Sequence, residues 1–471
     1  MNTESNPEIA QPVKSYPKRK VWMKTYGCQM NYHDSERVMD HLGELNFTPT
    51  EDQNEADLIL FNTCSIRDLA NQKFYSHLGE TKRIKEAKGE KVVIGVGGCI
   101  AQVEGKELVK KYRHLDFAFG TDVIDQIGDF VFRSFSGDSK FAVNTWDRST
   151  NYSIETKITH DEPRAFVNII KGCNKVCSYC IVPFTRGKER SRKVSEVRDD
   201  IKKLVEHRGV QEITLLGQNV NSFGKDNGET LTELVGELEK VNGLHVLRYT
   251  TSHPYDVSDE LIAAHGWSTK LAPHLHLPVQ SGSTTVLKRM RREYTKDHYL
   301  GLLEKLRASK PGIVVSSDII VGFPNETDDE FADTIDLLNR AEFDFIYSYT
   351  YSERKGTRAS RMDDTLTDKI KSERLQFLQK HQLEIQKNLR TQMVGKRYLV
   401  WVDGDSNMGG VYKLKGRTPC YRIVHFEPPV SGGELKDFKW HWMEVEVSGA
   451  TALSAQAKVI KDWGINPPTI H

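Results

Sequence analysis

Three cysteines, Cys173, Cys177 and Cys180, stand within eight residues of one another in the spacing C-x3-C-x2-C. Thiolates are soft ligands that favour iron–sulfur clusters or zinc. A closed structural zinc site takes four ligands, and no fourth cysteine stands close by. A [4Fe–4S] cluster is normally held by one cysteine at each iron, so three cysteines would leave one iron open. The motif therefore predicts a cluster that binds a small molecule at its open iron.

Three further cysteines occupy the same position in a repeated strand–helix pattern. The expected strands cover residues 21–26, 57–62 and 91–96, and helical patterns follow at about 34–45, 67–88 and 103–111. Cys28, Cys64 and Cys99 stand just past the ends of the three strands. Alternating strands and helices predict an open parallel α/β sheet over residues 20–150.

These three thiols are expected to meet at one edge of that sheet. The carboxyl ends of parallel strands form the ligand crevice, and neighbouring strands lie about 4.8 Å apart. Gly27, Gly97 and Gly98 permit close backbone approach beside the cysteines. The pattern predicts a second three-cysteine metal centre with an open position. Buried core thiols are the alternative, and Cys420, far downstream, is interpreted as such a bystander.

Residues 155–390 contain a longer repetition of strands and helices. The expected strands cover residues 165–170, 212–216, 246–250, 274–277, 313–321 and 345–350. Six such units predict a full or partial (β/α) barrel, whose active site lies at the carboxyl ends of the strands. The loops there carry side chains suited to an amino acid, a ribose or an adenine. The candidate small-molecule contacts are Tyr179, Gln218, Ser252, Gln280 and Asp318.

Two basic runs lie in the same segment. The first comprises Arg186, Lys188, Arg190, Arg192 and Lys193, and the second comprises Lys288, Arg289, Arg291 and Arg292. Charge runs are usually solvated surfaces. The first run, however, directly follows the Cys173–Cys180 motif, where a phosphate backbone would be held near the active site. We therefore expect RNA contacts from four of its five members, Arg186, Lys188, Arg190 and Arg192.

The C-terminal segment changes character after a charged amphipathic helix at 373–390. Short strands with glycines are expected at 397–402, 409–414, 422–425 and 444–447, which predicts a small antiparallel β-barrel over residues 391–460. Nine basic and seven acidic residues lie between positions 396 and 458. Mildly basic barrels with aromatic faces often bind single-stranded RNA. Arg417 is the candidate contact, and a module that merely covers the central barrel is the alternative.

Composition limits the remaining possibilities. The 471 residues are 38% hydrophobic and 28% charged, with a net charge of +1, so RNA binding must come from local patches. No apolar run is long enough to predict a membrane helix. The polar, proline-containing residues 1–19 predict a disordered tail rather than a secretory signal, and residues 461–471 form a second expected tail. Seven cysteines without an export signal favour a reducing cytoplasm.

The cysteine motifs and the order of the segments resemble one enzyme family. Cys173–Cys180, with Tyr179 before the last cysteine, is similar to the signature of radical S-adenosylmethionine (SAM) enzymes. The three segments together resemble the methylthiotransferases, which have an N-terminal cluster domain, a radical SAM core and a C-terminal TRAM domain. The stretches most similar to the tRNA-modifying members are Thr25–Asn31, Asn62–Arg67, Gly172–Lys175, Arg186–Gly187 and Gly416–Thr418. Asn325 and Ser352–Gly356 depart from the family pattern, away from any expected ligand.

The resemblance implies two [4Fe–4S] clusters and SAM as cofactors. One SAM methylates a sulfide at the open iron of the Cys28, Cys64 and Cys99 cluster. Another is cleaved at the second cluster to a 5′-deoxyadenosyl radical. That radical abstracts hydrogen from C2 of N6-isopentenyladenosine, at position 37 beside the tRNA anticodon, and the methylthio group is transferred there. C2–H is not acidic, so a radical route is physically reasonable.

The resemblance also implies particular partners: the tRNA anticodon stem-loop and an external one-electron donor, with a cytoplasmic monomer and no membrane association. No catalytic side chain beyond the cluster ligands is expected. Two alternatives stay open. One is a sister methylthiotransferase acting on threonylcarbamoyladenosine or on an aspartate of a ribosomal protein. The other is a zinc protein that binds RNA without catalysis.

Overall fold

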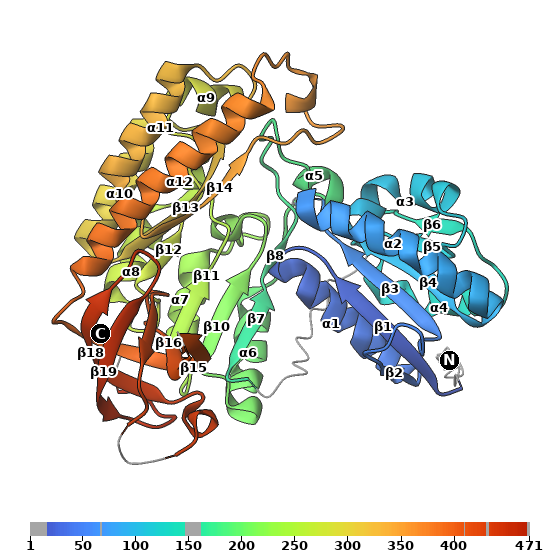
Figure 1. The fold of residues 1–471 in the computed structure, drawn as a ribbon, viewed down its shortest axis with the longest axis horizontal. Helices are drawn as coiled ribbons and strands as arrows, with labels where there is room; N and C mark the ends of the chain where they lie inside the picture. The colour runs from blue at the N-terminus through green and yellow to red at the C-terminus, as the bar shows by residue number, and fades with distance from the viewer. Residues whose placement is uncertain (1–16, 66–67, 147–161, 409, 430–432, 469–471) are drawn as a thin grey trace, which may run out of the picture. The chain divides into compact units, whose positions relative to one another are not determined.

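The computed structural model describes residues 17–65, 68–146, 162–408, 410–429 and 433–468 (Figure 1). Most of the expected tail 1–19 and the last three residues of the tail 461–471 therefore lie outside the described residues. The chain divides into two compact units. Residues 1–151 together with 184–186 form the N-terminal unit, and residues 152–183 together with 187–471 form the second.

The N-terminal unit is built on a six-stranded parallel sheet in the order β2-β1-β3-β4-β5-β6. The strands are β1 (Arg19–Thr25), β2 (Phe47–Pro49), β3 (Leu58–Thr63), β4 (Val93–Gly98), β5 (Phe117–Phe119) and β6 (Phe141–Val143). The helices are α1 (Gln29–Glu44), α2 (Asp68–Lys88), α3 (Cys99–Lys111) and α4 (Ile127–Phe135). The predicted open parallel α/β sheet is thus confirmed.

Helices cover both faces of this sheet, which explains why its central strands β3 and β4 are buried throughout and largely apolar. Ile59 and Phe61 of β3 pack in one core with residues of α2 and α3. Leu58 and Leu60, which point to the opposite face, pack in a second core with residues of α1 and α4. The alternation of side chains along one strand therefore supplies both cores.

The second unit contains two three-stranded parallel sheets. Their strands are β7 (Arg164–Asn168), β10 (Glu212–Leu216), β11 (Val246–Tyr249), β12 (His274–His276), β13 (Val314–Val321) and β14 (Phe345–Thr350). The sheet orders are β11-β10-β7 and β12-β13-β14, and a parallel bridge between Leu247 and Leu271 extends the first sheet toward β12. Within the described residues β7 and β14 do not pair, so the strands form a partial barrel.

Helices alternate with these strands and enclose a single large core. They include α6 (Val194–Arg208), α7 (Leu231–Glu239), α8 (Asp259–Trp267), α10 (Lys296–Ser309), α11 (Asp328–Ala341) and α12 (Asp368–Thr391). Local sequence fixes their starts. At α11, Thr327 accepts a hydrogen bond from the Glu330 backbone N–H, and the Glu330 carboxylate accepts one from the Thr327 N–H. This capping box satisfies two amides that the helix itself leaves unbonded.

The C-terminal strands close into a five-stranded barrel in the order β15-β16-β17-β19-β18. They are β15 (Arg397–Met408), β16 (Val411–Arg417), β17 (Ile423–Phe426), β18 (Trp442–Ala450) and β19 (Ala455–Asp462). The expectation of a purely antiparallel barrel needs correction, because β17 and β19 pair in parallel. The sequence analysis missed β19, which inserts between β17 and β18 and closes the barrel.

None of the helices in the described residues is long and apolar enough to cross a membrane.

A buried carboxylate joins the barrel to the rest of the second unit. Asp344, just before β14, is 2% exposed. Arg390 near the end of α12 donates two hydrogen bonds to its oxygens, at 2.6 and 2.7 Å. Arg422 of the barrel donates a third at 2.6 Å. One charge therefore fixes a core strand, the connecting helix and the barrel to one another.

We expect Asp344→Asn to destabilise this unit strongly. The change leaves two largely buried guanidinium groups beside a neutral amide, and breaking such buried pairs typically costs about 3–5 kcal/mol. Urea unfolding followed by circular dichroism measures the loss. Asp328→Asn is the matched control, because Asp328 also pairs with an arginine at 2.6 Å but its side chain is 98% exposed. Equal losses in the two variants would contradict this role for Asp344.

Candidate metal centres

The first cysteine motif forms a loop between β8 (Ile170–Lys171) and α5 (Val182–Thr185). Gly172 begins the loop with φ of +82°, and a Cβ built there would lie 2.1 Å from the carbonyl oxygen of Lys188. Only glycine tolerates both the conformation and this approach. The close approach is made by the returning chain, where β9 (Arg190–Ser191) pairs antiparallel with β8. The loop is thus held at its base by backbone contacts.

The thiols of this loop have hydrogen-bond donors suited to an anionic cluster. The backbone N–H of Lys175 donates to Cys173 Sγ at 3.4 Å, and Nη1 of Arg292 donates to Cys177 Sγ at 3.5 Å. Burial, together with the neighbouring Cys180 and Cys177 thiols, raises the pKa of Cys173 to about 12, against the lowering effect of the Lys175 N–H. Burial likewise raises the pKa of Cys180 to about 12, with Cys177 adding to the effect. The three sulfurs therefore lie close enough to influence one another's ionisation.

Arg292 is a buried cation beside these thiols. It is 5% exposed, and it also donates to the Tyr294 hydroxyl and to the Pro278 carbonyl, both at 2.8 Å. The sequence analysis treated Arg292 as part of a basic run on the surface. Its neighbour Arg289 is engaged as well, in an ion pair with Glu330. Within this run, Arg292 is therefore a buried cation near the thiols, and Arg289 forms a structural ion pair.

The other three cysteines lie where the parallel sheet was expected to bring them. Cys28 caps the start of α1, Cys64 directly follows β3, and Cys99 is the first residue of α3. The preceding strands β1, β3 and β4 are direct neighbours in the sheet. Cys64 and Cys99 are buried, and Cys28 is half-buried. The structure thus gathers three thiols along one edge of the sheet.

A glycine and a buried asparagine shape this edge. Gly27 has φ of +126°, and a Cβ there would lie 2.4 Å from the Cβ of Cys64. The buried Asn31 accepts a hydrogen bond from the Cys28 thiol at 3.2 Å and donates to the Thr63 carbonyl at 2.8 Å. The residue before Cys28 must therefore be small, and Asn31 links the first cysteine to the segment that carries the second.

A buried arginine accompanies this trio too. Arg186 is 3% exposed and forms an ion pair with the buried Asp34 at 2.6 Å. Burial raises the pKa of the Cys99 thiol, the charge of Arg186 and its hydrogen bond to the thiol lower it, and Cys28 raises it. Arg186 belongs to the short segment 184–186 that groups with the N-terminal unit. Each cysteine trio therefore has one buried guanidinium at its side.

The residues at both trios fit an iron–sulfur cluster in donor type and surroundings. Three thiols supply soft ligands, and buried N–H donors and guanidinium groups offset the negative charge that thiolates bring into the interior. Within the described ranges, no three His, Cys, Asp or Glu side chains are already gathered in a geometry that would hold a metal ion. The assignment of the six cysteines as ligands is accordingly a proposal.

Four of the five candidate small-molecule contacts lie on loops of the partial barrel, and the fifth, Asp318, lies within strand β13. Gln218 accepts a hydrogen bond from the Gly172 N–H, which ties it to the cysteine loop. Gln280 and Asp318 are joined by a backbone hydrogen bond of 2.8 Å. Tyr179 packs against the small apolar cluster that includes Phe323. The structure thus joins Gln218 to the cysteine loop and brings Gln280 and Asp318 together as a second pair.

Ser252 provides the observation that bears on SAM. It is 4% exposed at the carboxyl end of β11, and its Oγ has no hydrogen-bond partner among the described residues. Nε2 of the adjacent His253 is also buried without a partner. Burial and the charge of Arg292 hold the pKa of His253 well below its usual value, so this imidazole is neutral. Unsatisfied buried polar atoms at such a strand end are suited to a polar ligand. The sequence analysis did not select His253.

The expected RNA contacts of the first basic run need correction at two positions. Arg186 is buried against Asp34, and Arg192 is buried with its guanidinium 2.6 Å from Asp200. Neither guanidinium is available to a phosphate, because each neutralises a carboxylate. Lys188 is exposed and Arg190 is half-buried, so these two stay candidates. The acidic partners lie elsewhere in the sequence, which a local charge run does not reveal.

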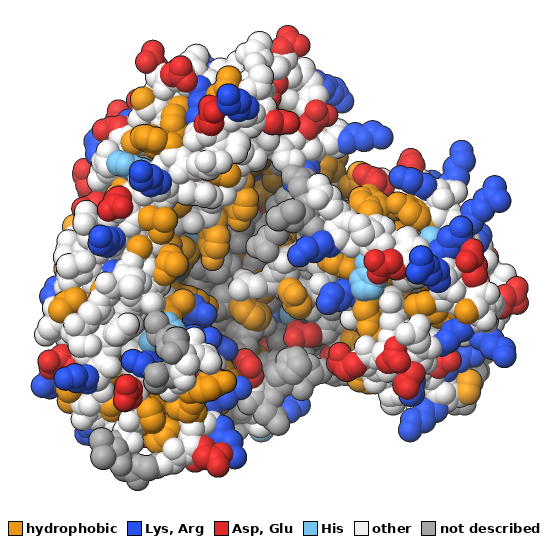
Figure 2. Space-filling model, viewed as in Figure 1, with side chains coloured by type: hydrophobic (Ala, Val, Ile, Leu, Met, Phe, Trp, Pro, Cys, Tyr) orange, Lys and Arg blue, Asp and Glu red, His pale blue; other side chains and the backbone are white. Residues whose placement is uncertain are grey.

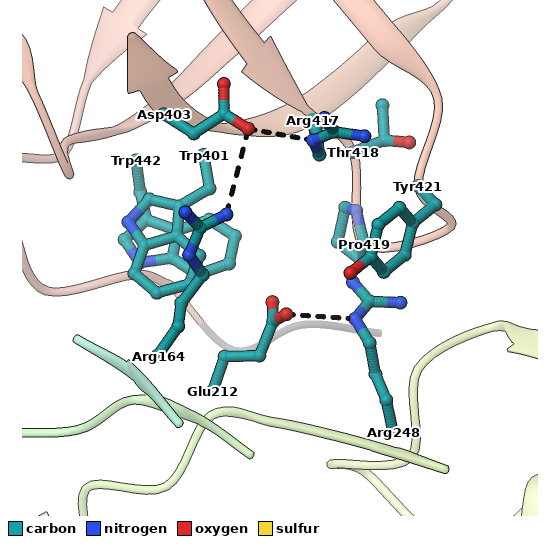
Figure 3. Close-up of a pocket in the computed structure, with 10 residues that line it drawn as sticks. All are labelled: Arg164, Glu212, Arg248, Trp401, Asp403, Arg417, Thr418, Pro419, Tyr421 and Trp442. Atoms are coloured by element: carbon teal, nitrogen blue, oxygen red, sulfur yellow. Dashed lines mark hydrogen bonds and ion pairs between the residues drawn. The ribbon is translucent and has the colours of Figure 1, made fainter. Parts of the chain in front are cut away.

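Arg417 lies at the junction between the core strands and the C-terminal barrel (Figure 3). It donates to Asp403 at 2.7 Å, and Arg164 approaches the same carboxylate oxygen at 3.7 Å. Opposite them, Arg248 lies 3.2 Å from Glu212 and over the ring of Tyr421. These pairs line a small cavity between the two parts. Arg417 therefore takes part in this junction, and its side chain stays 35% exposed, so its RNA contact stays a prediction.

Two family descriptions match the chain. Residues 20–120 match the uncharacterized protein family UPF0004, and residues 167–338 match the Radical SAM superfamily. A solved structure with a similar fold is the radical S-adenosylmethionine methyltransferase TsrM from Kitasatospora setae, with cobalamin and a [4Fe–4S] cluster bound. Its TM-score is 0.53 at 11% identity, over 73% of this chain and 77% of that one. This likeness concerns the fold alone.

Curated relatives match nearly the whole chain. The protein named tRNA-2-methylthio-N(6)-dimethylallyladenosine synthase from Syntrophus aciditrophicus is 45% identical over 87% of this chain and 89% of its own length. The protein of the same name from Ruegeria pomeroyi is 39% identical over 93% of this chain and 99% of its own length.

Gly27→Ala should remove the metal centre of the N-terminal unit. The added Cβ would collide with Cys64 and strain a backbone that favours glycine, so these two cysteine segments would move apart. We expect reconstituted protein to lose about half its iron, because one of two four-iron centres is affected. Iron analysis after anaerobic reconstitution measures this. Gly43→Ala is the control, since a Cβ there meets nothing within 4 Å, and an unchanged iron content in Gly27→Ala would refute the assignment.

Arg292→Met should shift the reduction potential of a cluster at Cys173, Cys177 and Cys180 to more negative values. The change removes a buried positive charge and a hydrogen bond to sulfur, both of which favour the reduced state. A shift of about 60 mV would correspond to a tenfold change in a one-electron equilibrium. Redox titration followed by electron paramagnetic resonance measures it. The exposed neighbour Arg291→Met should leave the potential unchanged, and equal potentials in both variants would contradict the role of Arg292.

Proposed function

The chain belongs to the family of the tRNA-2-methylthio-N6-dimethylallyladenosine synthases, which are radical SAM methylthiotransferases, and we propose how its residues serve that reaction. The reaction adds a methylthio group to C2 of N6-isopentenyladenosine at position 37 of tRNA. The observation that carries the assignment is the match of both relatives across the two segments that hold the cysteine trios. Both relatives carry the same name. This agreement favours N6-isopentenyladenosine as the substrate over threonylcarbamoyladenosine or an aspartate of a ribosomal protein.

In this proposal the two cysteine trios hold one [4Fe–4S] cluster each. Cys173, Cys177 and Cys180 hold the cluster of the core, and Cys28, Cys64 and Cys99 hold that of the N-terminal unit. When bound, the clusters supply the electron for SAM cleavage and the sulfur for insertion. Three protein ligands for each cluster leave one position for a ligand that is not protein. The support in this chain is the position of one trio along a sheet edge and of the other on one short loop, each beside a buried arginine.

The protein groups around the core trio bind and orient SAM. We assign this role to Tyr179, Gln218, Ser252, Gln280 and Asp318. The buried Ser252 Oγ without a partner is the strongest support, because a polar ligand would satisfy it. Gln218 also positions the loop itself, through the hydrogen bond that it accepts from Gly172. SAM bound there would exclude water from the surrounding polar atoms.

The proposed partners follow from the reaction. The substrate is the anticodon stem-loop, whose target adenosine is unpaired and can be turned out of the stack at modest cost. Lys188 and Arg190 are the remaining candidates for contacts to its phosphates. An external donor supplies one electron at a time, and the protein acts as a monomer in the cytoplasm, where its tRNA substrate resides.

Mutations in the two cysteine trios are expected to remove different activities of the protein. Cys99→Ala should keep SAM cleavage to 5′-deoxyadenosine but abolish formation of methylthiolated nucleoside. Cys177→Ala should abolish both, because the electron for SAM cleavage no longer arrives. Mass spectrometry of digested tRNA and chromatography of the SAM products measure the two outcomes. Cys420→Ala is the control for loss of a thiol and should keep both activities.

Methylthiolated product from the Cys99→Ala protein would refute the role of the N-terminal trio. Deoxyadenosine from the Cys177→Ala protein would refute that of the core trio.

A further inference from the structure

A basic groove lies on the N-terminal unit between α3 and β6. It has a volume of about 530 Å³ and is lined by Lys106, Val109, Lys110, Arg113, Lys140 and Ala142. Four of these six residues are cationic, and none of the described lining residues is acidic. We propose that this groove binds the phosphate backbone of the stem that carries the substrate loop. The inference rests on the proposed function and adds a binding surface to it.

The spacing of residues along α3 builds the groove. Lys106 and Lys110 stand four residues apart on one face of α3, and Arg113 follows two residues past the end of the helix at Lys111. Gly105 lets the helix lie close to the sheet, because a Cβ there would already stand 3.5 Å from the methyl groups of Ala118 and Ala142. The cationic residues therefore line the seam between α3 and the edge strand β6, two elements that lie next to each other in Figure 1.

Among the described residues, three cations of the groove are not neutralised by ion pairs, whereas some other surface lysines of the N-terminal unit are. Lys106, Lys110 and Arg113 are exposed, and in the described part of the chain none of them forms an ion pair. By contrast, Lys20 pairs with Glu55 and Lys82 pairs with Glu86. Three unpaired cations on one face produce a local positive potential in a chain of net charge +1.

Lys140 differs from the other three cations, because it also supports the fold. Its Nζ donates to the Leu115 carbonyl at 2.8 Å and lies 3.6 Å from Asp116. Asp116 is itself paired with Lys85 at 2.7 Å. Lys140 therefore closes the floor of the groove and is left intact in the test below.

The lining selects a phosphate backbone over bases or an apolar partner. A groove whose described lining holds four cations and no acid suits a polyanion, and contacts to phosphates position a nucleic acid without reading its sequence. Proteins that grip single-stranded bases add aromatic side chains for stacking, and the described lining has none. Sequence-independent contact to a stem fits this chemistry better than contact to the loop.

The position of the groove on α3 agrees with that assignment. The helix begins with Cys99, and Lys106 and Lys110 follow it by seven and eleven residues. At a rise of 1.5 Å per residue, they lie about 10 and 16 Å from Cys99 along the helix axis. A strand of B-form DNA advances about 3.4 Å per base pair, and a strand of an A-form RNA stem advances slightly less. The groove would thus hold phosphates several base pairs away from the cysteine edge, within a stem.

The test compares RNA binding by two triple charge reversals in the full-length, cluster-loaded protein. The groove variant is K106E/K110E/R113E. The control, K203E/K240E/K305E, changes the net charge equally at lysines that are 71%, 72% and 58% exposed and paired with acids. Fluorescence anisotropy measures binding of an isopentenylated anticodon stem-loop RNA between 50 and 200 mM salt. SAM cleavage without RNA confirms that both variants are folded and loaded.

We expect the groove variant to bind the RNA at least about tenfold more weakly than the control near 0.1 M salt. The slope of log affinity against log salt concentration should be smaller by about 3, which is about 0.9 for each of the three lost phosphate contacts. An RNA affinity and a salt slope equal to those of the control variant would overturn the proposal that this groove binds RNA. The proposal would also be overturned if the groove variant bound RNA normally but could no longer be reduced by an acidic protein donor. The groove would then bind a protein. A neutral variant, K106Q/K110Q/R113Q, gives the same comparison should the reversal fail to fold.

Failure of the proposed function has a different signature. Wild-type protein that binds the stem-loop without ever methylthiolating it would refute that function, while the difference in affinity between the two variants would still decide the groove.

Discussion

A buried guanidinium beside each cysteine trio is the interaction on which the two sites depend. Ionised thiols in a protein interior are costly unless nearby positive charges and N–H donors stabilise them. Arg292 donates to Cys177, and Arg186 acts on Cys99 while it is held by Asp34. The cations differ in how they are balanced. Arg292 is anchored by neutral oxygens, whereas Arg186 shares its charge with a carboxylate, so the two centres have different local electrostatics.

The scaffold brings the thiols together in two distinct ways. In the N-terminal unit, three neighbouring parallel strands each deliver one cysteine at the same edge, and Gly27 lets two of the segments approach. In the core, one short loop supplies all three cysteines, and its shape depends on Gly172 and on the paired strands β8 and β9. The first arrangement depends on the register of a sheet, and the second on local backbone geometry.

Much of this could be predicted from the sequence. Hydrophobic strands of four to eight residues between helical patterns located β10 and β14 at their observed bounds, and the spacing of Cys28, Cys64 and Cys99 by one strand–helix unit placed them at one edge of the sheet. Strand β19 was missed, and its parallel pairing with β17 depends on how the chain returns across the barrel, which no local pattern encodes.

Arginine roles could not be predicted for a related reason. Arg186, Arg192 and Arg292 belong to basic runs that predict exposed surfaces. Each is buried against a partner outside its own basic run: Arg186 against Asp34, Arg192 against Asp200 in the next helix, and Arg292 against the Cys177 thiol. Conversely, Lys106, Lys110 and Arg113 are interspersed with acids along the chain, so only the helix and its neighbouring strand reveal that they share one groove.

The central claim is that both trios hold iron–sulfur clusters in the same protein molecule. Iron and sulfide analysis of anaerobically reconstituted wild-type protein, combined with Mössbauer spectroscopy, tests it most directly. The account predicts about eight irons and a matching amount of sulfide per chain, all in [4Fe–4S] clusters. About four irons per chain, or zinc in place of iron at either trio, would contradict it.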